Sequence, residues 1–529
     1  PQAILGFMNT TLLALERLLC ANAIPARTAH ITDTAGASPQ GDVPIDGADC
    51  DSRLAMRDHL FICKGAAFKA AYLIDALAKG CCAYLCDKSH ADELAVVAPG
   101  VPALVVADDA LRQAMARASA EAWGHPDRDV KIVGITGTKG KSTCAYMLRA
   151  ILDAGHDAAQ AAILGSIDTF DGVERFESVN TTPEAPDLWR HIANVRSSGL
   201  PYLVMEVSSQ ALKYDRVVGL DLDVGCFLNI GRDHISPAEH PDFEDYFSSK
   251  LRIFDQTRVA AVNLDMDRAD ETLARARACK RLLAFSAKGP TTQGTPDIWA
   301  RDVRPTGAGI HFVAHTPSWE EELFLSMPGL FNVENALGAI AACEALGVEQ
   351  GQVREGLAHT RVPGRMELLT TSSPKITGIV DYAHNKLSYQ RFFSSLSKEF
   401  PDCEIIAVFG APGGKAFERR QELPQEASRW ADYLIFTEED PAHEPVGEIC
   451  AQMARSTPKG QPHEVILERP RAIERAVELG LAAKRNAIVC LLAKGDETRQ
   501  HEGDAFVPCE TDTTLFYRAV SRQLGQAEP

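Results

Sequence analysis

GITGTKGKST, at residues 134–143, is the stretch that decides the fold of this chain. It follows an apolar strand pattern at Val130–Val133 and leads into a helical pattern at Ala145–Ala154. Glycines in such a strand–loop–helix unit let backbone N–H groups face phosphate oxygens, and the helix N-terminus adds partial positive charge. The stretch therefore predicts a phosphate-binding loop in which Lys141 reaches the terminal phosphates and Ser142 binds Mg²⁺.

The spacing of this loop differs from the strict P-loop, because Ile135 stands where that motif has a glycine. A glycine-rich turn with an incidental lysine is the alternative interpretation. The strand and helix patterns on either side favour the phosphate loop.

On both sides of the loop, apolar strand-like runs alternate with helical stretches, which is typical of α/β domains. A chain of 529 residues corresponds to about three or four domains. The polar stretch Gly124–Asp129 is interpreted as a linker, and the turn-rich Arg361–Arg365 as a second boundary. We expect domains at residues 1–127, 128–364 and 365–529.

The composition excludes some classes of partner. With 54 Lys and Arg against 72 Asp and Glu, the formal net charge is -18, which argues against nucleic acid and anionic membranes as partners. No apolar run is long enough to span a bilayer, and Pro1–Thr10 lacks the pattern of a signal peptide. The 14 cysteines are scattered, and the alternation of Cys82, Tyr84 and Cys86 indicates a core strand rather than a metal site. We expect a cytoplasmic monomer with reduced thiols.

A second group of residues follows the loop. Glu206 ends the apolar run Leu203–Glu206, and a carboxylate at a strand end beside a phosphate loop is a natural Mg²⁺ ligand. The variant loop and the block from Glu206 to Lys250 together resemble the Mur ligase family, which includes folylpolyglutamate synthetase and the ligase domain of cyanophycin synthetase. The block is most similar to the MurE subfamily, whose members add the third amino acid to the peptidoglycan precursor.

This resemblance implies a three-domain α/β architecture, with a central P-loop parallel-sheet ATPase domain and a C-terminal Rossmann-like domain. It implies ATP and Mg²⁺ as cofactors, with Lys141, Glu206, His234 and Lys250 as catalytic residues. The implied metal ligands are Ser142, Glu206, His234 and a carbamylated Lys250, for which an exposed helical lysine is the alternative interpretation. The implied ATP-binding residues are Gly137, Thr138, Lys139, Gly140, Lys141, Ser142, Thr143, Asn332, Asn335, Arg365 and Asp381.

The resemblance also implies UDP-MurNAc-L-Ala-D-Glu as a substrate. Its binding residues would be Ser52, Thr181, Thr182, Ser208 and Arg216. Asp51-Ser52-Arg53 alone is equally consistent with a turn and helix cap, and the stretch Lys64–Lys69 matches the family only in part. Asn332 and Asn335 lie on one predicted helix face, where their amides offer the donors and acceptors that adenine needs. Asn332 and Asp381 belong to different predicted domains, so a competent ATP site would require domain closure over ATP.

The third substrate is expected at the ends of three later strands, where the resemblance implies Lys415, Glu439, Asp440 and Glu497 as amino-acid-binding residues. Members that add diaminopimelate have Asp-Asn-Pro-Arg where this chain has Glu439-Asp440-Pro441-Ala442. Without that arginine, the acidic pair favours a side-chain ammonium over a second carboxylate. L-lysine is therefore expected, with L-ornithine next and meso-diaminopimelate as a further alternative.

Two other functions fit parts of this sequence. A folylpolyglutamate-type ligase would share the phosphate loop, but the first domain, which resembles a UDP site, weighs against it. A nucleotide-binding protein without ligase turnover would share the fold, but Glu206, His234 and Lys250 weigh against that. Amino-acid-dependent release of phosphate from ATP discriminates between these hypotheses.

Overall fold

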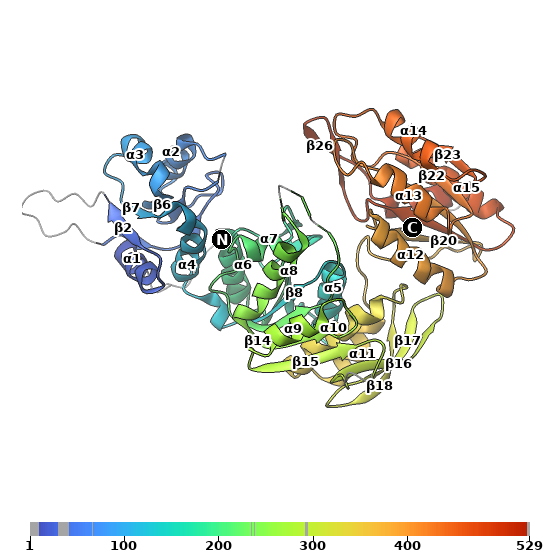
Figure 1. Ribbon diagram of the computed structural model, residues 1–529, viewed down its shortest axis with the longest axis horizontal. Coiled ribbons are helices and arrows are strands. Elements are labelled where there is room, and N and C mark those ends of the chain that lie inside the picture. The colour runs from blue at the N-terminus through green and yellow to red at the C-terminus, as the bar shows by residue number, and fades with distance from the viewer. Residues whose placement is uncertain are drawn as a thin grey trace, which may run out of the picture. The chain divides into compact units, whose positions relative to one another are not determined.

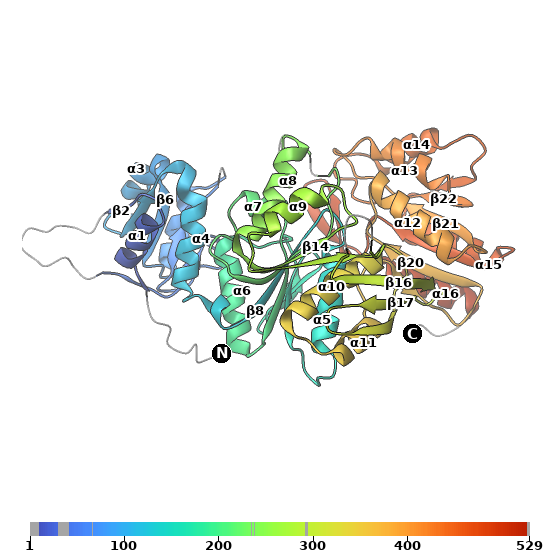
Figure 2. The ribbon, with the colours of Figure 1, turned by 60° about the horizontal axis from the view of Figure 1, so that its bottom comes forward.

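The computed structural model describes residues 10–29, 42–65, 67–233, 235–236, 239–290 and 295–525 (Figure 1, Figure 2). The chain divides into two compact units. The first comprises Pro1–Ser286, Pro296–Ile298 and Gly338–Gln352, and the second comprises Ala287–Thr295, Trp299–Leu337 and Val353–Pro529. The predicted boundaries near residues 127 and 364 stay a prediction.

The N-terminal part of the first unit is built on a sheet with helices on both faces (Figure 1). Its strands lie in the order β2 (Ala26–Ala29), β7 (Ala103–Val106), β6 (Ala83–Asp87), β5 (Leu60–Ile62) and β4 (Ala48–Asp49), with β2 antiparallel to its neighbour. The helices are α1 (Leu12–Ala21), α2 (Ala70–Ala78), α3 (Lys88–Val97) and α4 (Leu111–Ala122). A short pair, β1 (Thr10–Thr11) and β3 (Pro44–Ile45), precedes them.

Alternate side chains of these strands pack into two separate cores, one on each face of the sheet. Leu60 and Leu85 pack with the apolar side chains of α1 and α4, whereas Phe61, Tyr84 and Cys86 pack with those of α2 and α3. Successive side chains of a strand point to opposite faces, so a sheet covered on both sides needs apolar residues at every position. The predicted core strand at Cys82–Cys86 is confirmed, shifted by one residue.

The predicted linker at Gly124–Asp129 is more ordered than its composition indicates. It contains the 3-10 turn η2 (Pro126–Arg128), and Pro126 and Asp127 are buried. The carboxylate of Asp127 accepts a hydrogen bond from the backbone N–H of Asp221 at 3.2 Å. The linker is therefore fixed to the central part by a long-range contact, which local composition cannot reveal.

The central part of the first unit is a largely parallel sheet. Its parallel strands lie in the order β9 (Ala161–Leu164), β12 (Tyr202–Glu206), β8 (Lys131–Thr136), β13 (Leu222–Phe227), β14 (Thr257–Asn263) and β15 (Arg281–Ser286). The antiparallel β10 (Asp168–Phe170) and β11 (Arg175–Glu177) extend it beyond β9. The helices are α5 (Lys141–Asp153), α6 (Ala185–Ser198), α7 (Ser209–Lys213), α8 (Phe243–Leu251) and α9 (Ala269–Ala276), with the 3-10 turn η3 (Arg252–Gln256) after α8.

The second unit contains antiparallel strands and a C-terminal sheet. The antiparallel strands β16 (Ile298–Pro305), β17 (Ile310–His315) and β18 (Glu320–Leu325) were not predicted from the sequence. The C-terminal sheet has the order β19 (Glu367–Leu369), β20 (Ile376–Asp381), β24 (Ala487–Leu492), β21 (Glu404–Phe409), β22 (Tyr433–Phe436) and β23 (His463–Val465). All its strands are parallel except β19, as expected of a Rossmann-like sheet.

The helices α10 (Asn332–Leu346) and α11 (Gln350–Ala358) follow β18 along the chain. The C-terminal sheet carries α12 (Lys386–Glu399), α13 (Arg419–Ala427), α14 (Val446–Ser456), α15 (Arg469–Ala482) and α16 (Asp512–Leu524), and the hairpin β25 (Arg499–Glu502) and β26 (Ala505–Pro508) follows β24. Among the described residues, no helix is long and apolar enough to cross a membrane.

Candidate active site

The phosphate loop lies between β8 and α5, as predicted. Gly140 caps α5 with φ +87°, and Gly137 has φ +155°. A Cβ atom at Gly137 would lie 3.1 Å from Cβ of Leu228 and 3.3 Å from the backbone N of Asn229. Glycine is needed here because the loop approaches the end of β13 closely and turns toward the N-terminus of α5, where an anion would bind.

Asn229 holds this loop in shape. Its Oδ1 accepts from the backbone N–H of Lys139 at 2.9 Å, and its Nδ2 donates to the carbonyl of Lys139 at 2.9 Å. The hydroxyl of Tyr246 lies 3.0 Å from Oγ1 of Thr138, and Lys139 forms an ion pair with Asp233 at 3.1 Å. Asn229 was not predicted as a site residue, although it lies within the block from Glu206 to Lys250. No local sequence pattern shows that an asparagine after a strand binds the backbone of a loop 90 residues away.

Lys141 and Lys250 meet at one carbonyl group. The Nζ atoms of both donate to the carbonyl O of Gly137, at 3.1 Å from Lys141 and 3.0 Å from Lys250. Lys250, on α8, is only 2% exposed, and its Nζ also lies 4.9 Å from the ring centre of Tyr246. The alternative of an exposed helical lysine is therefore wrong. Burial, and secondarily the charge of Lys141, lower the pKa of Lys250 well below its usual value.

The predicted metal ligand Glu206 lies at the carboxyl end of β12, opposite Ile135 of β8. It is buried, and its carboxylate accepts from the backbone N–H of Ser166 at 2.8 Å and from the hydroxyl of Ser166 at 3.3 Å. Ser142 is partly exposed at the start of α5. His234, the other predicted ligand, lies outside the described residues. A buried carboxylate beside a hydroxyl-bearing phosphate loop fits a hard divalent cation such as Mg²⁺.

The residues expected to bind the muramoyl dipeptide lie next to Glu206. The hydroxyl of Thr182 donates to the carbonyl of Glu206 at 2.9 Å and accepts from the backbone N–H of Ser208 at 3.0 Å. Arg216 donates to the carbonyl of Thr182 at 3.0 Å, and Thr181 lies 2.9 Å from Ser166 through their hydroxyls. The structure thus brings together four of the five predicted residues.

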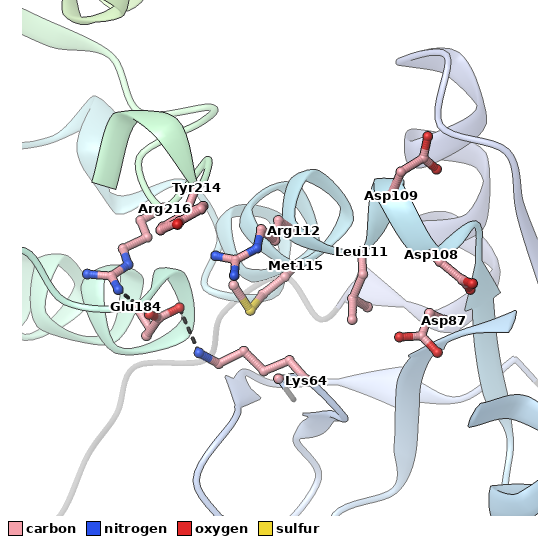
Figure 3. A pocket seen from close by; sticks show the side chains of 11 residues that line it. Lys64, Asp87, Asp108, Asp109, Leu111, Arg112, Met115, Glu184, Tyr214 and Arg216 are labelled. Carbon is pink, nitrogen blue, oxygen red and sulfur yellow. Dashed lines mark ion pairs between the residues drawn. The ribbon is translucent and has the colours of Figure 1, made fainter. Parts of the chain in front are cut away.

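A cavity of about 400 Å³ opens beside Arg216 (Figure 3). Glu184 stands at one side, where its carboxylate pairs with Arg216 and with Lys64, each at 2.7 Å. The guanidinium of Arg112 lies 4.2 Å from the ring centre of Tyr214. Burial acts to raise the pKa of Glu184, but the charges of Lys64 and Arg216 outweigh it and hold that pKa below its usual value. The sequence did not single out Lys64, Arg112 or Glu184 as binding residues.

The fifth predicted residue of this set, Ser52, is not among the residues that line the cavity. It is buried, and its carbonyl O accepts from Nζ of Lys79 at 2.6 Å. Asp51 accepts from the backbone N–H of Arg53 at 2.9 Å, so the turn at Asp51-Ser52-Arg53 is confirmed. The helix cap is wrong, because the next helix, α2, begins at Ala70 and its N-cap residue is Lys69. The role of Ser52 in substrate binding stays a prediction.

In the second unit, the residues expected on the adenosine side make two sets of contacts. The amide of Asn335 donates to Oδ1 of Asn332 at 2.9 Å, and both residues are buried. The carboxylate of Asp381 accepts from the backbone N–H of Met366 at 2.8 Å. Arg365 pairs with Asp496 at 3.2 Å and lies over the ring of Tyr382. The predicted common helix face of the two asparagines is confirmed.

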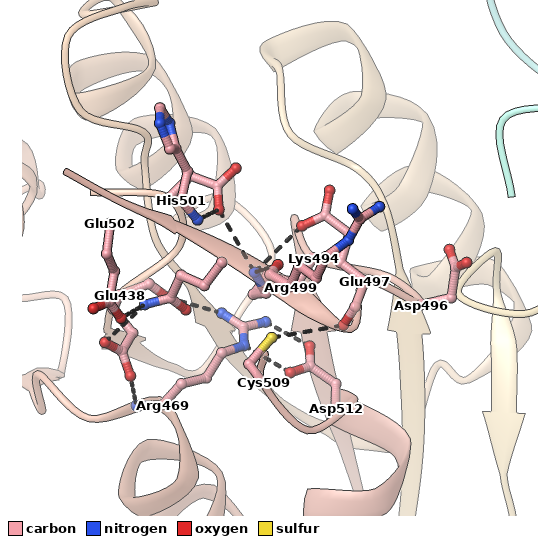
Figure 4. A network of polar contacts seen from close by, with 12 residues as sticks. Glu438, Arg469, Lys494, Asp496, Glu497, Arg499, His501, Glu502, Cys509 and Asp512 are labelled. Atoms are coloured by element: carbon pink, nitrogen blue, oxygen red, sulfur yellow. Dashed lines mark hydrogen bonds and ion pairs between the residues drawn. The ribbon is translucent and has the colours of Figure 1, made fainter. Parts of the chain in front are cut away.

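The loops after β21, β22 and β24 converge in the second unit, as predicted. The backbone N–H of Gly413 donates to the carbonyl of Asp440 at 2.9 Å. Lys494 is buried and pairs with Glu497 at 3.3 Å (Figure 4). It also pairs with Asp440 at 3.7 Å. Lys415 is exposed on its turn, so its predicted role stays a prediction.

Glu439 is the most unusual side chain of this group. It is buried, and in the part of the chain that the structure describes its Oε2 has no hydrogen-bond partner. Burial raises the pKa of Glu439 to about 7, opposed by Arg419 and reinforced by Asp440. Burial also raises the pKa of Glu497, while Lys494 lowers it. A buried carboxylate without a donor is costly, so this site suits a cationic ligand.

A glycine-rich loop, a buried strand-end carboxylate and a buried lysine define an ATP-dependent enzyme of the P-loop α/β class. The models of the Mur ligase middle domain and of the Mur ligase glutamate ligase domain match residues 135–343 and 364–495. The L-lysine ligase for UDP-N-acetylmuramoyl-L-alanyl-D-glutamate from Enterococcus faecalis is 34% identical over 91% of this chain and 93% of its own. The UDP-N-acetylmuramyl-tripeptide synthetase of Bifidobacterium longum is 35% identical over 92% and 94%.

A solved structure of a UDP-N-acetylmuramoyl-L-alanyl-D-glutamate–2,6-diaminopimelate ligase has the same fold, with a TM-score of 0.63 and 24% identity over 93% of this chain and 97% of that one. The chain belongs to the Mur ligase family of ATP-dependent ligases and has its three-domain α/β architecture. Within that family it is a MurE-like tripeptide synthetase.

Proposed function

We propose that this protein adds L-lysine to UDP-MurNAc-L-Ala-D-Glu, with ATP as the energy source. The free carboxylate of the D-glutamyl residue attacks the γ-phosphorus of ATP, and ADP leaves. The α-amine of lysine then attacks the resulting acyl phosphate, and inorganic phosphate leaves. The observation that carries the choice of lysine is Glu439, a buried carboxylate whose Oε2 has no hydrogen-bond partner among the described residues.

The first unit supplies the groups for the phosphoryl transfer. Lys141 and the N–H groups of the loop bind the phosphates, and Asn229 keeps the loop in place. Glu206, Ser142, His234 and a carbamylated Lys250 would hold Mg²⁺, which when bound offsets the negative charge of ATP. A buried, neutral lysine amine reacts with CO₂ to form a carbamate and releases one proton. The carbamate would place an anion where the unmodified side chain is a neutral amine.

The second unit supplies the side chains proposed to bind the adenosine of ATP and the incoming amino acid. Asn332 and Asn335 would recognise adenine, with Arg365 toward the phosphates and Asp381 toward the ribose. Glu439 would accept the side-chain ammonium of the incoming amino acid, next to Asp440 and Glu497, which also pair with Lys494. Ala442 adds no cation there to pair with a second carboxylate.

The nucleotide-sugar would enter the cavity beside Arg216. Three cations, Lys64, Arg112 and Arg216, line this side of the cavity, and Glu184 is the one anion beside them. The two negative charges of a diphosphate would neutralise the remaining positive charge. Asp87, Asp108 and Asp109 lie on the opposite side of the cavity (Figure 3), which restricts the diphosphate to the cationic side.

Lys64→Met is expected to weaken binding of UDP by about 10- to 100-fold, because it removes a charged partner of the diphosphate. Binding of uridine, which has no phosphate, should change little. Calorimetric titration of both ligands measures the two affinities. Lys69→Met, which removes a lysine outside the cavity from the same domain, is the control. Equal losses for UDP and uridine would contradict this placement of the diphosphate.

The reaction itself is tested by phosphate release from ATP in the presence of UDP-MurNAc-L-Ala-D-Glu, with L-lysine, L-ornithine and meso-diaminopimelate supplied in parallel. Turnover with lysine supports the proposal. Turnover with ornithine alone keeps the acidic site but changes its ligand, since one methylene is worth only about 1–3 kcal/mol. Turnover with diaminopimelate alone refutes the acidic-site argument, and no turnover with any of them refutes the proposed reaction.

A further inference from the structure

The last residue of α12, Glu399, holds a backbone loop that belongs to a different β-structure. The loop Pro328–Phe331 joins the antiparallel strands to α10, which begins at Asn332. The backbone N–H of Gly329 lies 2.9 Å from both carboxylate oxygens of Glu399, and that of Leu330 lies 3.1 Å from Oε1. Glu399 is 8% exposed, so these hydrogen bonds form away from water.

Ser395, one helical turn earlier, completes the contact. Its hydroxyl donates to Oε1 of Glu399 at 2.7 Å and accepts from the backbone N–H of Leu330 at 2.5 Å. Burial raises the pKa of Glu399, and the hydrogen bonds from Ser395, Gly329 and Leu330 oppose that rise. Burying a carboxylate is costly, and a plain packing contact would need only apolar side chains. The arrangement instead fixes the direction of two backbone N–H groups.

The loop that Glu399 holds leads directly to the predicted adenine-binding residues. The carbonyl O of Pro328 accepts from Nδ2 of Asn332 at 2.7 Å, and Oδ1 of Asn332 accepts from Asn335. Gly329 has φ +95°, and a Cβ atom there would lie 2.8 Å from Nδ2 of Asn332 and 3.2 Å from Cγ of Met366. A shift of the loop backbone would therefore move the amide of Asn332.

Helix α12 also follows Asp381, the residue predicted to bind the ribose. The segment after Asp381 leads into α12, which Asn385 caps by accepting from the backbone N–H of Ser388 at 3.0 Å. Helix α12 thus begins just after Asp381 and ends at Glu399. The adenine and ribose residues are connected through one rigid element of the C-terminal domain.

We propose that Glu399 is a positioning residue for ATP, which orients the adenine-binding amide of Asn332 through the loop Pro328–Phe331 without touching the nucleotide. This inference rests on the proposed adenine site. It makes nucleotide affinity depend on a contact with the amino-acid-binding domain. Residues that hold a binding side chain in its orientation affect the affinity for the ligand, even when they do not touch it.

The test is steady-state kinetics of the full chain carrying Glu399→Gln, with ADP affinity measured separately by calorimetry. The carboxamide keeps the shape of the side chain, but its NH₂ group faces a loop N–H. KM for ATP should rise about tenfold, with kcat changed by less than about twofold and the KM values of the other two substrates unchanged. ADP affinity should fall by a similar factor. Ser395→Ala should give a smaller rise in KM for ATP, of about threefold.

Glu355→Gln, at an exposed glutamate of α11, is the matched control and should leave KM for ATP unchanged. Asn332→Ala tests the adenine site itself. If Asn332→Ala weakens ADP binding but Glu399→Gln and Ser395→Ala do not, the inference is refuted while the proposed function stands. A lower Tm with unchanged KM for ATP would make Glu399 purely structural and would also refute it. If Glu399→Gln does not fold, Ser395→Ala decides.

Discussion

Lys250→Met is expected to lower kcat by about 10³-fold, the largest loss of any single substitution outside the phosphate loop. The substitution preserves volume in a buried place but removes the amine that we propose to be carbamylated. Removal of one pre-organised charged group from a site of phosphoryl or acyl transfer typically costs about 10²- to 10³-fold. Phosphate release at saturating concentrations of all three substrates measures the loss.

Lys250→Arg separates the two possible roles of this side chain. If Lys250 acted as a cation, arginine would retain part of the activity. A carbamate is an anion, so we expect arginine to be as damaging as methionine, and a small carboxylate such as acetate to restore some turnover to Lys250→Met. Lys280→Ala, at a lysine of the same unit far from the phosphate loop in sequence, is the control. High activity of Lys250→Arg would refute carbamylation.

Glu439→Gln is expected to raise KM for L-lysine by about 100-fold with little change in KM for ATP. Loss of one partner of a buried charge pair costs about 2–5 kcal/mol, and each 1.4 kcal/mol is about tenfold in affinity. Glu448→Gln, at an exposed glutamate of α14, should leave both KM values unchanged. A KM for lysine that is insensitive to Glu439→Gln would remove the basis for choosing lysine.

The affinity for lysine should also depend on pH in a defined direction. Burial raises the pKa of Glu439 to about 7, so below pH 7 the free protein holds a proton that must leave before an ammonium can pair with the carboxylate. Affinity should therefore rise about tenfold per pH unit up to about pH 7 and level off above it. Calorimetric titration of L-lysine between pH 5.5 and pH 8.5, about the range where the protonation of Glu439 changes, measures this dependence. The dependence should vanish in Glu439→Gln.

Local sequence was sufficient for much of the fold. Strands β20 (Ile376–Asp381) and β24 (Ala487–Leu492) can be recognised in the sequence, because a buried parallel strand is a short, continuous apolar run bounded by polar turns. The phosphate loop was also recognisable, since its chemistry needs glycines and a lysine at fixed spacing. The antiparallel strands β16–β18 were missed because alternation of exposed and buried residues, with charged side chains on one face, leaves no continuous apolar run.

The sequence by itself determined the family and predicted the phosphate loop and the candidate site residues, because those features depend on residue types at fixed short spacings. Tertiary structure decided which side chains are buried and what they touch. The burial of Lys250, the missing partner of Glu439 Oε2 among the described residues, and the contacts of Asn229 and Glu399 with distant backbone all depend on residues far away in the chain. Such contacts arise only when the sheets assemble, so no local pattern encodes them.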